Sequence, residues 1–75
     1  MITEQFGEYT LTGLPGRKGS QRYSVGVIIE KNKDGLKNKQ IFQAEDGICY
    51  ILAIEAAKEG INLGKNLIKQ NRVGF

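Results

Sequence analysis

An Asp-Gly dipeptide between two strand-like runs constrains the fold of this chain more than any other feature. Residues 23–30 alternate between apolar side chains and mostly small or polar ones, which is the period of a half-buried strand. Asp34 and Gly35 follow, and both residue types tolerate the positive φ angles that a type I′ turn requires. The sequence therefore predicts an antiparallel hairpin that joins residues 23–30 to residues 39–44.

A two-residue turn also sets the register of that hairpin. The predicted pairing gives one apolar face, and on the other face it gives an isoleucine pair and an opposite-charge pair. The predicted pairs are Val25 with Ala44, Val27 with Phe42, Ile28 with Ile41, and Glu30 with Lys39.

The N-terminal part of the chain predicts one more strand and a loop. Residues 6–11 place Tyr9 and Leu11 on one face, which suits a strand. Residues 13–20 hold three glycines and Pro15, the only proline of the chain, and this composition is typical of a loop.

Two helices are expected after the hairpin. The first runs from about residue 45 or 46 to residue 59, with Gly60 as its C-terminal cap. Residues 48–54 are apolar on nearly every side of that helix, so it needs cover on more than one face. A second, short helix is expected from Leu63 to about Gln70, with Asn62 as its cap, and it would supply that cover.

The resulting expectation is a single small domain over residues 1–75 of the α+β class. It contains a three-stranded antiparallel sheet, followed by a long helix and a short C-terminal helix, in the order β-β-β-α-α. The chain has 75 residues, no histidine and one cysteine, Cys49. An intrachain disulfide is therefore excluded, and the usual zinc ligand sets cannot be assembled.

The start of the chain and its hydropathy indicate a cytoplasmic protein. Residues 1–5 are polar and acidic rather than basic and then apolar, as a signal peptide would be. The apolar runs are far shorter than the ~20 residues of a membrane span. We expect no membrane contact, and Cys49 is expected to be a free thiol that packs inside the first helix.

The sequence offers no catalytic, cofactor-binding or metal-binding residues, and we expect no enzyme. The order of glycines and lysine in residues 13–19 does not match a phosphate-binding loop. Two acid pairs, Glu45 with Asp46 and Glu55 with Glu59, have no base or metal ligand associated with them. They are interpreted as a helix start and a solvated helix face.

Two basic clusters are the candidate contacts for an anionic partner, within a formal net charge of +3. One lies in the loop at residues 16–22 and the other at the lysine hairpin tip, residues 31–39. Strand 23–30 separates them by about 25 Å, and aromatic residues for base stacking do not accompany them. The seven residues are Arg17, Lys18, Arg22, Lys31, Lys33, Lys37 and Lys39.

The layout from Tyr23 onward resembles a family of short uncharacterised proteins of Gram-positive bacteria. The resemblance rests on residues 23–30, the long helix, Leu63, and the Leu67-Ile68 pair. It implies no activity, ligand or site residue. A three-stranded sheet followed by a helix is also similar to the DNA-binding domains of some integrases and plant transcription factors.

These observations favour a non-enzymatic binding or accessory module that acts through protein–protein contacts, including self-association. The alternative is a weak, sequence-independent nucleic-acid-binding domain that uses loop 16–22 or hairpin tip 31–39. Nucleic acid is not the favoured partner because the two basic clusters are separated.

Overall fold

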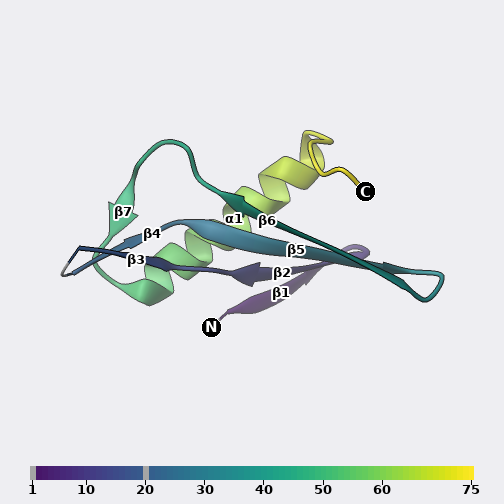
Figure 1. The fold of residues 1–75 in the computed structure, drawn as a ribbon, viewed down its shortest axis with the longest axis horizontal. Coiled ribbons are helices and arrows are strands. Elements are labelled where there is room, and N and C mark those ends of the chain that lie inside the picture. Colours follow the sequence, from purple (N-terminus) through teal and green to yellow (C-terminus); the bar gives the residue numbers. More distant parts are fainter. Residues whose placement is uncertain (1, 20) are drawn as a thin grey trace.

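One long antiparallel ribbon organises the protein, and a helix lies across one of its faces (Figure 1). The computed structural model describes residues 2–19 and 21–75. Its elements are β1 (Thr3–Phe6), β2 (Tyr9–Gly13), β3 (Gly16–Lys18), β4 (Arg22–Ser24), β5 (Gly26–Lys33), β6 (Leu36–Gln43), β7 (Cys49–Tyr50) and α1 (Ala53–Lys69). The expected end of the first loop, Ser20, lies outside the described residues.

The expected β-β-β-α-α arrangement is wrong. The described residues form seven strands in two antiparallel sheets and one helix. The larger sheet has the order β1-β2-β5-β6, and the smaller one has the order β3-β4-β7. Local periodicity missed the extra strands because β1, β3, β4 and β7 are only two to four residues long. In addition, β7 pairs with β4, which is distant in the sequence.

The two sheets share one long ribbon, in which β2 pairs with β5 and β3 pairs with β4. Tyr9 pairs with Lys31 at one end of this ribbon, and Lys18 pairs with Arg22 at the other end. The register is the same throughout. The ladder is interrupted at Pro15, which has no N–H to donate. Leu14 still donates its N–H to the carbonyl oxygen of Gly26 at 2.9 Å. Much of the expected loop at residues 13–20 is therefore strand, and the expected strand at 6–11 divides at Gly7.

The hairpin at Asp34-Gly35 is confirmed. Asp34 has a φ of 53° and Gly35 a φ of 77°, as a type I′ turn requires. β5 and β6 pair without interruption, and the predicted contacts of Val27 with Phe42, Ile28 with Ile41 and Glu30 with Lys39 are all present. The Ala44 N–H donates to the Val25 carbonyl oxygen at 2.9 Å, which continues the same register.

The helix begins later than expected, at Ala53 instead of residue 45 or 46. Gly47 has a φ of 73°, and a side-chain oxygen of Asp46 accepts the Ile48 N–H at 3.0 Å, so a turn forms at these residues. The chain then runs extended through β7, where Tyr50 pairs with Tyr23 of β4. This pairing uses the backbone groups that a helix would have required.

The helix also continues through Gly60 and Gly64, so the expected break and second helix are wrong. A Cβ on Gly60 would collide with the carbonyl oxygen of Gly26 in β5. A Cβ on Gly64 would lie 3.1–3.3 Å from side-chain atoms of Val27 and Leu11. Because these glycines have no side chain, the helix can approach the sheet closely. The stability gained from this close packing outweighs the poor helix propensity of glycine.

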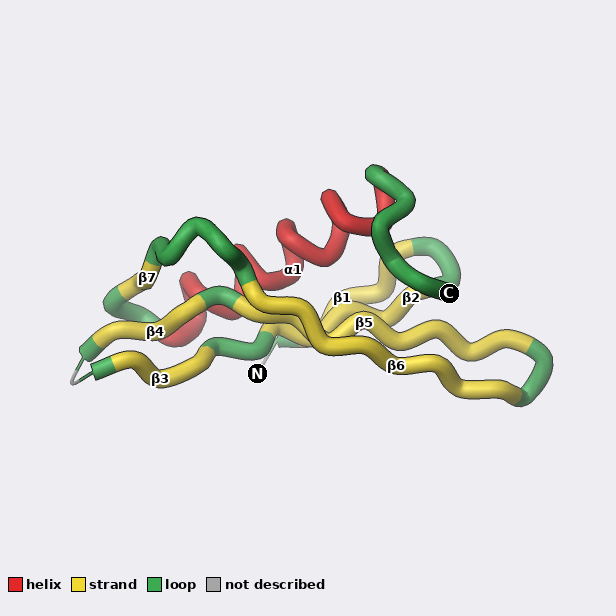
Figure 2. The backbone as a smooth tube through the Cα atoms, turned by 45° about the horizontal axis from the view of Figure 1, so that its top comes forward, coloured by secondary structure: helices red, strands yellow, loops and turns green. Residues whose placement is uncertain are grey.

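The helix α1 lies over one face of the larger sheet (Figure 2), and the core residues come from these two layers. Leu11, Val27 and Ile29 have no exposed surface, and Ile61 and Leu67 of the helix pack against them. The structure places no element of residues 2–19 and 21–75 over the opposite sheet face. The domain therefore has a two-layer architecture with one open sheet face.

Candidate interaction surface

The segment that leads into α1 exposes several large apolar side chains. The exposed fractions are 63% for Ile51, 53% for Leu52 and 54% for Ile54. The expectation that a helix buries these residues on two sides is wrong. We refer to Ile51, Leu52 and Ile54 as the apolar end surface.

Two hollows border the apolar end surface. One has a volume of about 530 Å³ and contains Ile51 and Leu52 in its wall, together with Arg22 and Glu55. The other has a volume of about 360 Å³ and is lined by Ile2, Pro15, Ala53, Ile54 and Ala57. The side chains that line the second hollow are all apolar, so this end of the domain offers both protruding and recessed apolar surface.

The backbone at the start of α1 contributes to this exposure. Leu52 occupies the N-cap position with φ −102° and ψ 131°, and no side chain caps the helix there. Leucine is a poor residue at this position because it has no oxygen to accept the first helical N–H groups. An apolar side chain is thus presented to solvent where a polar side chain would stabilise the free domain.

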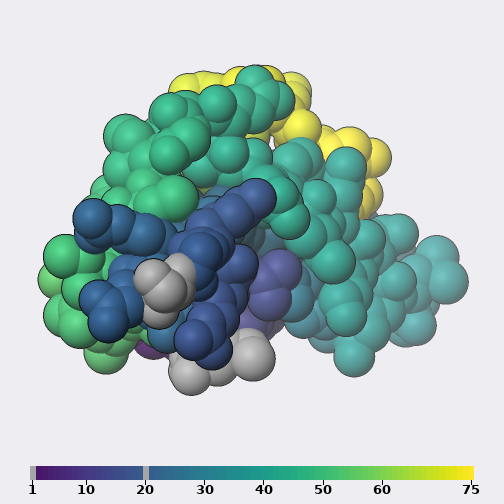
Figure 3. Space-filling model, turned by 60° about the vertical axis from the view of Figure 1, so that its left-hand side comes forward, coloured from purple at the N-terminus to yellow at the C-terminus, as the bar shows by residue number. Residues whose placement is uncertain are grey.

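The first basic cluster lies beside the apolar end surface. Figure 3 shows this end of the molecule, with the green atoms around residues 50–55 next to the blue atoms of β3 and β4. Arg17, Lys18 and Arg22 are exposed, and Arg22 lines the same hollow as Ile51. The sequence predicted these exposed cations, but it predicted that the apolar side chains next to them are buried.

The second basic cluster lies at the other end of the ribbon. The longest dimension of the molecule is 43 Å, and the β3–β4 and β5–β6 turns lie at its opposite ends (Figure 1). Lys33, Lys37 and Lys39 are exposed on the β5–β6 hairpin. The structure therefore keeps the two candidate clusters apart.

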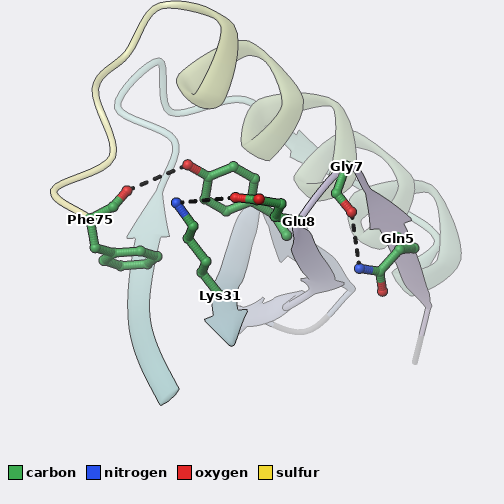
Figure 4. Close-up of polar contacts among 6 residues, drawn as sticks. Gln5, Gly7, Glu8, Lys31 and Phe75 are labelled. Carbon is green, nitrogen blue, oxygen red and sulfur yellow. Dashed lines mark hydrogen bonds and ion pairs between the residues drawn. The ribbon is translucent and has the colours of Figure 1, made fainter. Parts of the chain in front are cut away.

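Lys31 differs from the other lysines of the hairpin because its charge has partners inside the domain (Figure 4). Its ammonium nitrogen lies 3.4 Å from a Glu8 carboxylate oxygen and 5.3 Å from the centre of the Tyr9 ring. The Tyr9 hydroxyl in turn donates to the Phe75 carbonyl oxygen at 3.4 Å. Tyr9 thus contacts both Lys31 and the C-terminal Phe75, and only 16% of the Lys31 side chain is exposed.

Three carboxylates act on the hydroxyl of Tyr50, two from α1 and one from the segment between β6 and β7. Partial burial raises the pKa of the Tyr50 hydroxyl above its ordinary value, and the charges of Glu59, Asp46 and Glu55 raise it further. Within residues 2–19 and 21–75, no three His, Cys, Asp or Glu side chains are arranged to hold a metal ion. The surroundings of Tyr50 therefore have negative potential without a metal-ligand set.

Cys49 lies in β7, where it is exposed, so the expectation that it packs inside a helix is wrong. Its thiol lies 3.7 Å from the Gly47 carbonyl oxygen. In the part of the chain that the structure describes, no helix combines the length and apolarity needed to cross a membrane.

Comparison with known proteins identifies no relative. No protein-family model matches the chain, and no curated protein or solved structure matches it significantly. The function of this chain must therefore be inferred from its own surfaces.

Proposed function

We propose that this domain is a non-enzymatic module that binds a partner protein through the apolar end surface. The observation that supports this proposal is the exposure of Ile51, Leu52 and Ile54 by more than half, side by side along the chain and next to apolar hollows. Single exposed apolar residues are normal on protein surfaces. Grouped apolar residues with a polar rim are typical of interaction sites.

The charges around the surface define the kind of partner. Arg22 and Glu55 border the hollow that contains Ile51 and Leu52, so the apolar centre has a rim of both charge signs. This composition suits a protein partner with apolar anchors and polar flanks, because interfaces commonly combine an apolar core with a polar rim. The N-cap Leu52 fits the same interpretation, since local rules are most often broken at functional sites.

A pair of matched variants tests the proposal. Ile51→Ser removes an apolar side chain from the apolar end surface, and Leu36→Ser removes one that is 70% exposed at the distant β5–β6 turn. Tagged wild-type and variant domains are used to capture partners from native cytosol at moderate salt, and bound proteins are identified by mass spectrometry. We expect Ile51→Ser to lose a partner that Leu36→Ser retains.

The same variants distinguish a foreign partner from a second copy. Sedimentation of the purified domain would show a dimer that Ile51→Ser dissociates if the surface binds its own copy. Equal capture and equal sedimentation by wild type and Ile51→Ser would contradict the proposal.

We further propose that the domain acts in the cytosol. An exposed free thiol such as that of Cys49 is stable in a reducing compartment, which supports this location. Nucleic acid remains the alternative partner, supported by the exposed cations at both ends of the ribbon.

A further inference from the structure

The outer edge of the larger sheet is formed by a regular strand, β6, and it is separate from the apolar end surface. β6 is the last strand in the order β1-β2-β5-β6, so β5 is its only neighbour among the described residues. All eight residues of β6 pair with β5 in one register, without a bulge. A regular edge strand of this length can accept a further strand.

The register shows which backbone groups are free. In an antiparallel hairpin closed by a two-residue turn, Lys33 and Leu36 form a hydrogen-bonded pair, and hydrogen-bonded and non-hydrogen-bonded pairs then alternate. The bond from the Ala44 N–H to the Val25 carbonyl oxygen follows the same alternation. The N–H and C=O groups that point away from β5 therefore belong to Lys37, Lys39, Ile41 and Gln43.

The side chains of these residues indicate what the edge binds. Lys37 and Lys39 share the open sheet face, and the next residue on that face, Ile41, is 56% exposed. Glu30 lies opposite Lys39 on β5 and is the acid paired with this part of the strand. The free side of β6 thus combines two positive charges with one apolar position.

This charge pattern favours one kind of added strand over another. Lysines on an edge strand oppose pairing with a second β6, because the like charges would meet on one sheet face. The same lysines attract a strand that carries carboxylates at the facing positions. Charge complementarity therefore favours an acidic segment over a second copy of this chain.

We propose that the free edge of β6 binds an extended acidic segment of a partner protein as a fifth, antiparallel strand. Carboxylates of the segment lie opposite Lys37 and Lys39, and an apolar side chain lies opposite Ile41. Backbone hydrogen bonds supply affinity, and these three facing positions supply specificity. This strand pairing does not require the apolar end surface.

Hydrogen exchange with a synthetic peptide tests this inference. The probe has about ten residues with valine-threonine-glutamate-threonine-glutamate at its centre, a length typical of a strand. We expect it to slow exchange at the amides of residues 37, 39, 41 and 43. The amides of residues 38, 40 and 42 already bond to β5, so they should change little.

Two substitutions at one position separate backbone pairing from side-chain contact. Ile41→Pro removes an N–H that points to solvent, so the pairing of β5 with β6 survives, as edge strands tolerate proline at such positions. Ile41→Thr keeps the N–H and removes apolar surface. We expect Ile41→Pro to abolish peptide binding, while Ile41→Thr weakens it only several-fold; equal binding by both variants would overturn the proposal.

Charge reversal provides the specificity test. The double variant K37E/K39E should bind the glutamate peptide at least about tenfold more weakly, and it should prefer a peptide with lysine at both glutamate positions. Equal affinity of wild type for the two peptides would overturn the proposal. Slowed exchange at the same amides with rising protein concentration and no peptide would assign the edge to a second copy, which also overturns it.

Discussion

Gly60 of α1 lies directly against the backbone carbonyl oxygen of Gly26 in β5. Neither residue has a side chain, so the helix and the sheet meet backbone to backbone at this point. The same close approach recurs at Gly13, where a Cβ would collide with the carbonyl group of Ala57. The distance between the two layers therefore depends on glycine on both sides.

Gly60→Ala should destabilise the domain by about 3 kcal/mol or more, because a rigid carbonyl group must move to admit the methyl group. On an uncovered helix face the same change would add about 1 kcal/mol of stability. Urea unfolding measures the free energy, with Lys58→Ala on the exposed helix side as a control expected to change it by about 0.5 kcal/mol or less. A gain in stability from Gly60→Ala would contradict the observed packing.

Leu11→Ala and Leu52→Ala make the same chemical change at a buried and an exposed site. Leu11 has no exposed surface, so its truncation should leave a cavity and cost about 2–5 kcal/mol. Leu52 is 53% exposed, and its truncation should cost less than about 1 kcal/mol. The sequence predicted Leu52 as a core residue, and equal losses in thermal or urea unfolding would support that prediction over the structure.

Alkaline titration should show that Tyr50 ionises above the ordinary pH range of a tyrosine. Its pKa is raised above the ordinary value of 10.0, so the folded chain retains this proton at a pH where the unfolded chain releases it. Stability should therefore fall as the pH rises above about 10, and Tyr50→Phe should reduce that fall. Phenolate absorbance gives the pKa, which Glu59→Gln should lower; an unchanged pKa in this variant would show that the charge of Glu59 does not act on Tyr50.

Nucleic acid should bind weakly and without sequence preference. The two basic clusters lie at opposite ends of the ribbon, so one duplex segment meets few of their cations at once. We expect dissociation constants of about 10⁻⁴–10⁻⁶ M at physiological salt, with affinity decreasing as salt increases. Fluorescence anisotropy with DNA and RNA of several sequences measures this, and nanomolar affinity for one sequence would favour the nucleic-acid alternative.

The β5–β6 hairpin was predictable because its determinants are local. Asp34 and Gly35 specify the turn, and the alternation of apolar residues on both sides specifies the register. The same signal was present at Asp46-Gly47, where the structure also turns. There the apolar run that follows was interpreted as helix, because a short apolar segment does not distinguish a helix from a strand.

The start and the full extent of α1 were not predictable from local rules. The pairing of Tyr50 with Tyr23 joins residues far apart in the chain, and it decides where the helix can begin. Gly60 matches a helix cap in sequence, but its role is the contact with Gly26. Tertiary packing overrides the cap signal in this case.

The candidate surfaces were predictable only in part. The basic residues follow from composition, although the engagement of Lys31 with Glu8 and Tyr9 does not. The exposure of the apolar end surface depends on where α1 begins. The predicted helix began at residue 45 or 46, so these apolar side chains were expected to be buried. To identify the free edge of β6, the order of the strands in the sheet must be known, and no local sequence pattern specifies that order.

The order of the elements along the chain also determines which parts of the domain can fold first. Its hairpins join neighbouring segments through short turns, and contacts of this kind form quickly. The helix follows every strand in the chain, so during synthesis it leaves the ribosome after the ribbon is complete. Until the helix arrives, Leu11, Val27 and Ile29 remain in water, and the nascent ribbon must stay soluble without its cover.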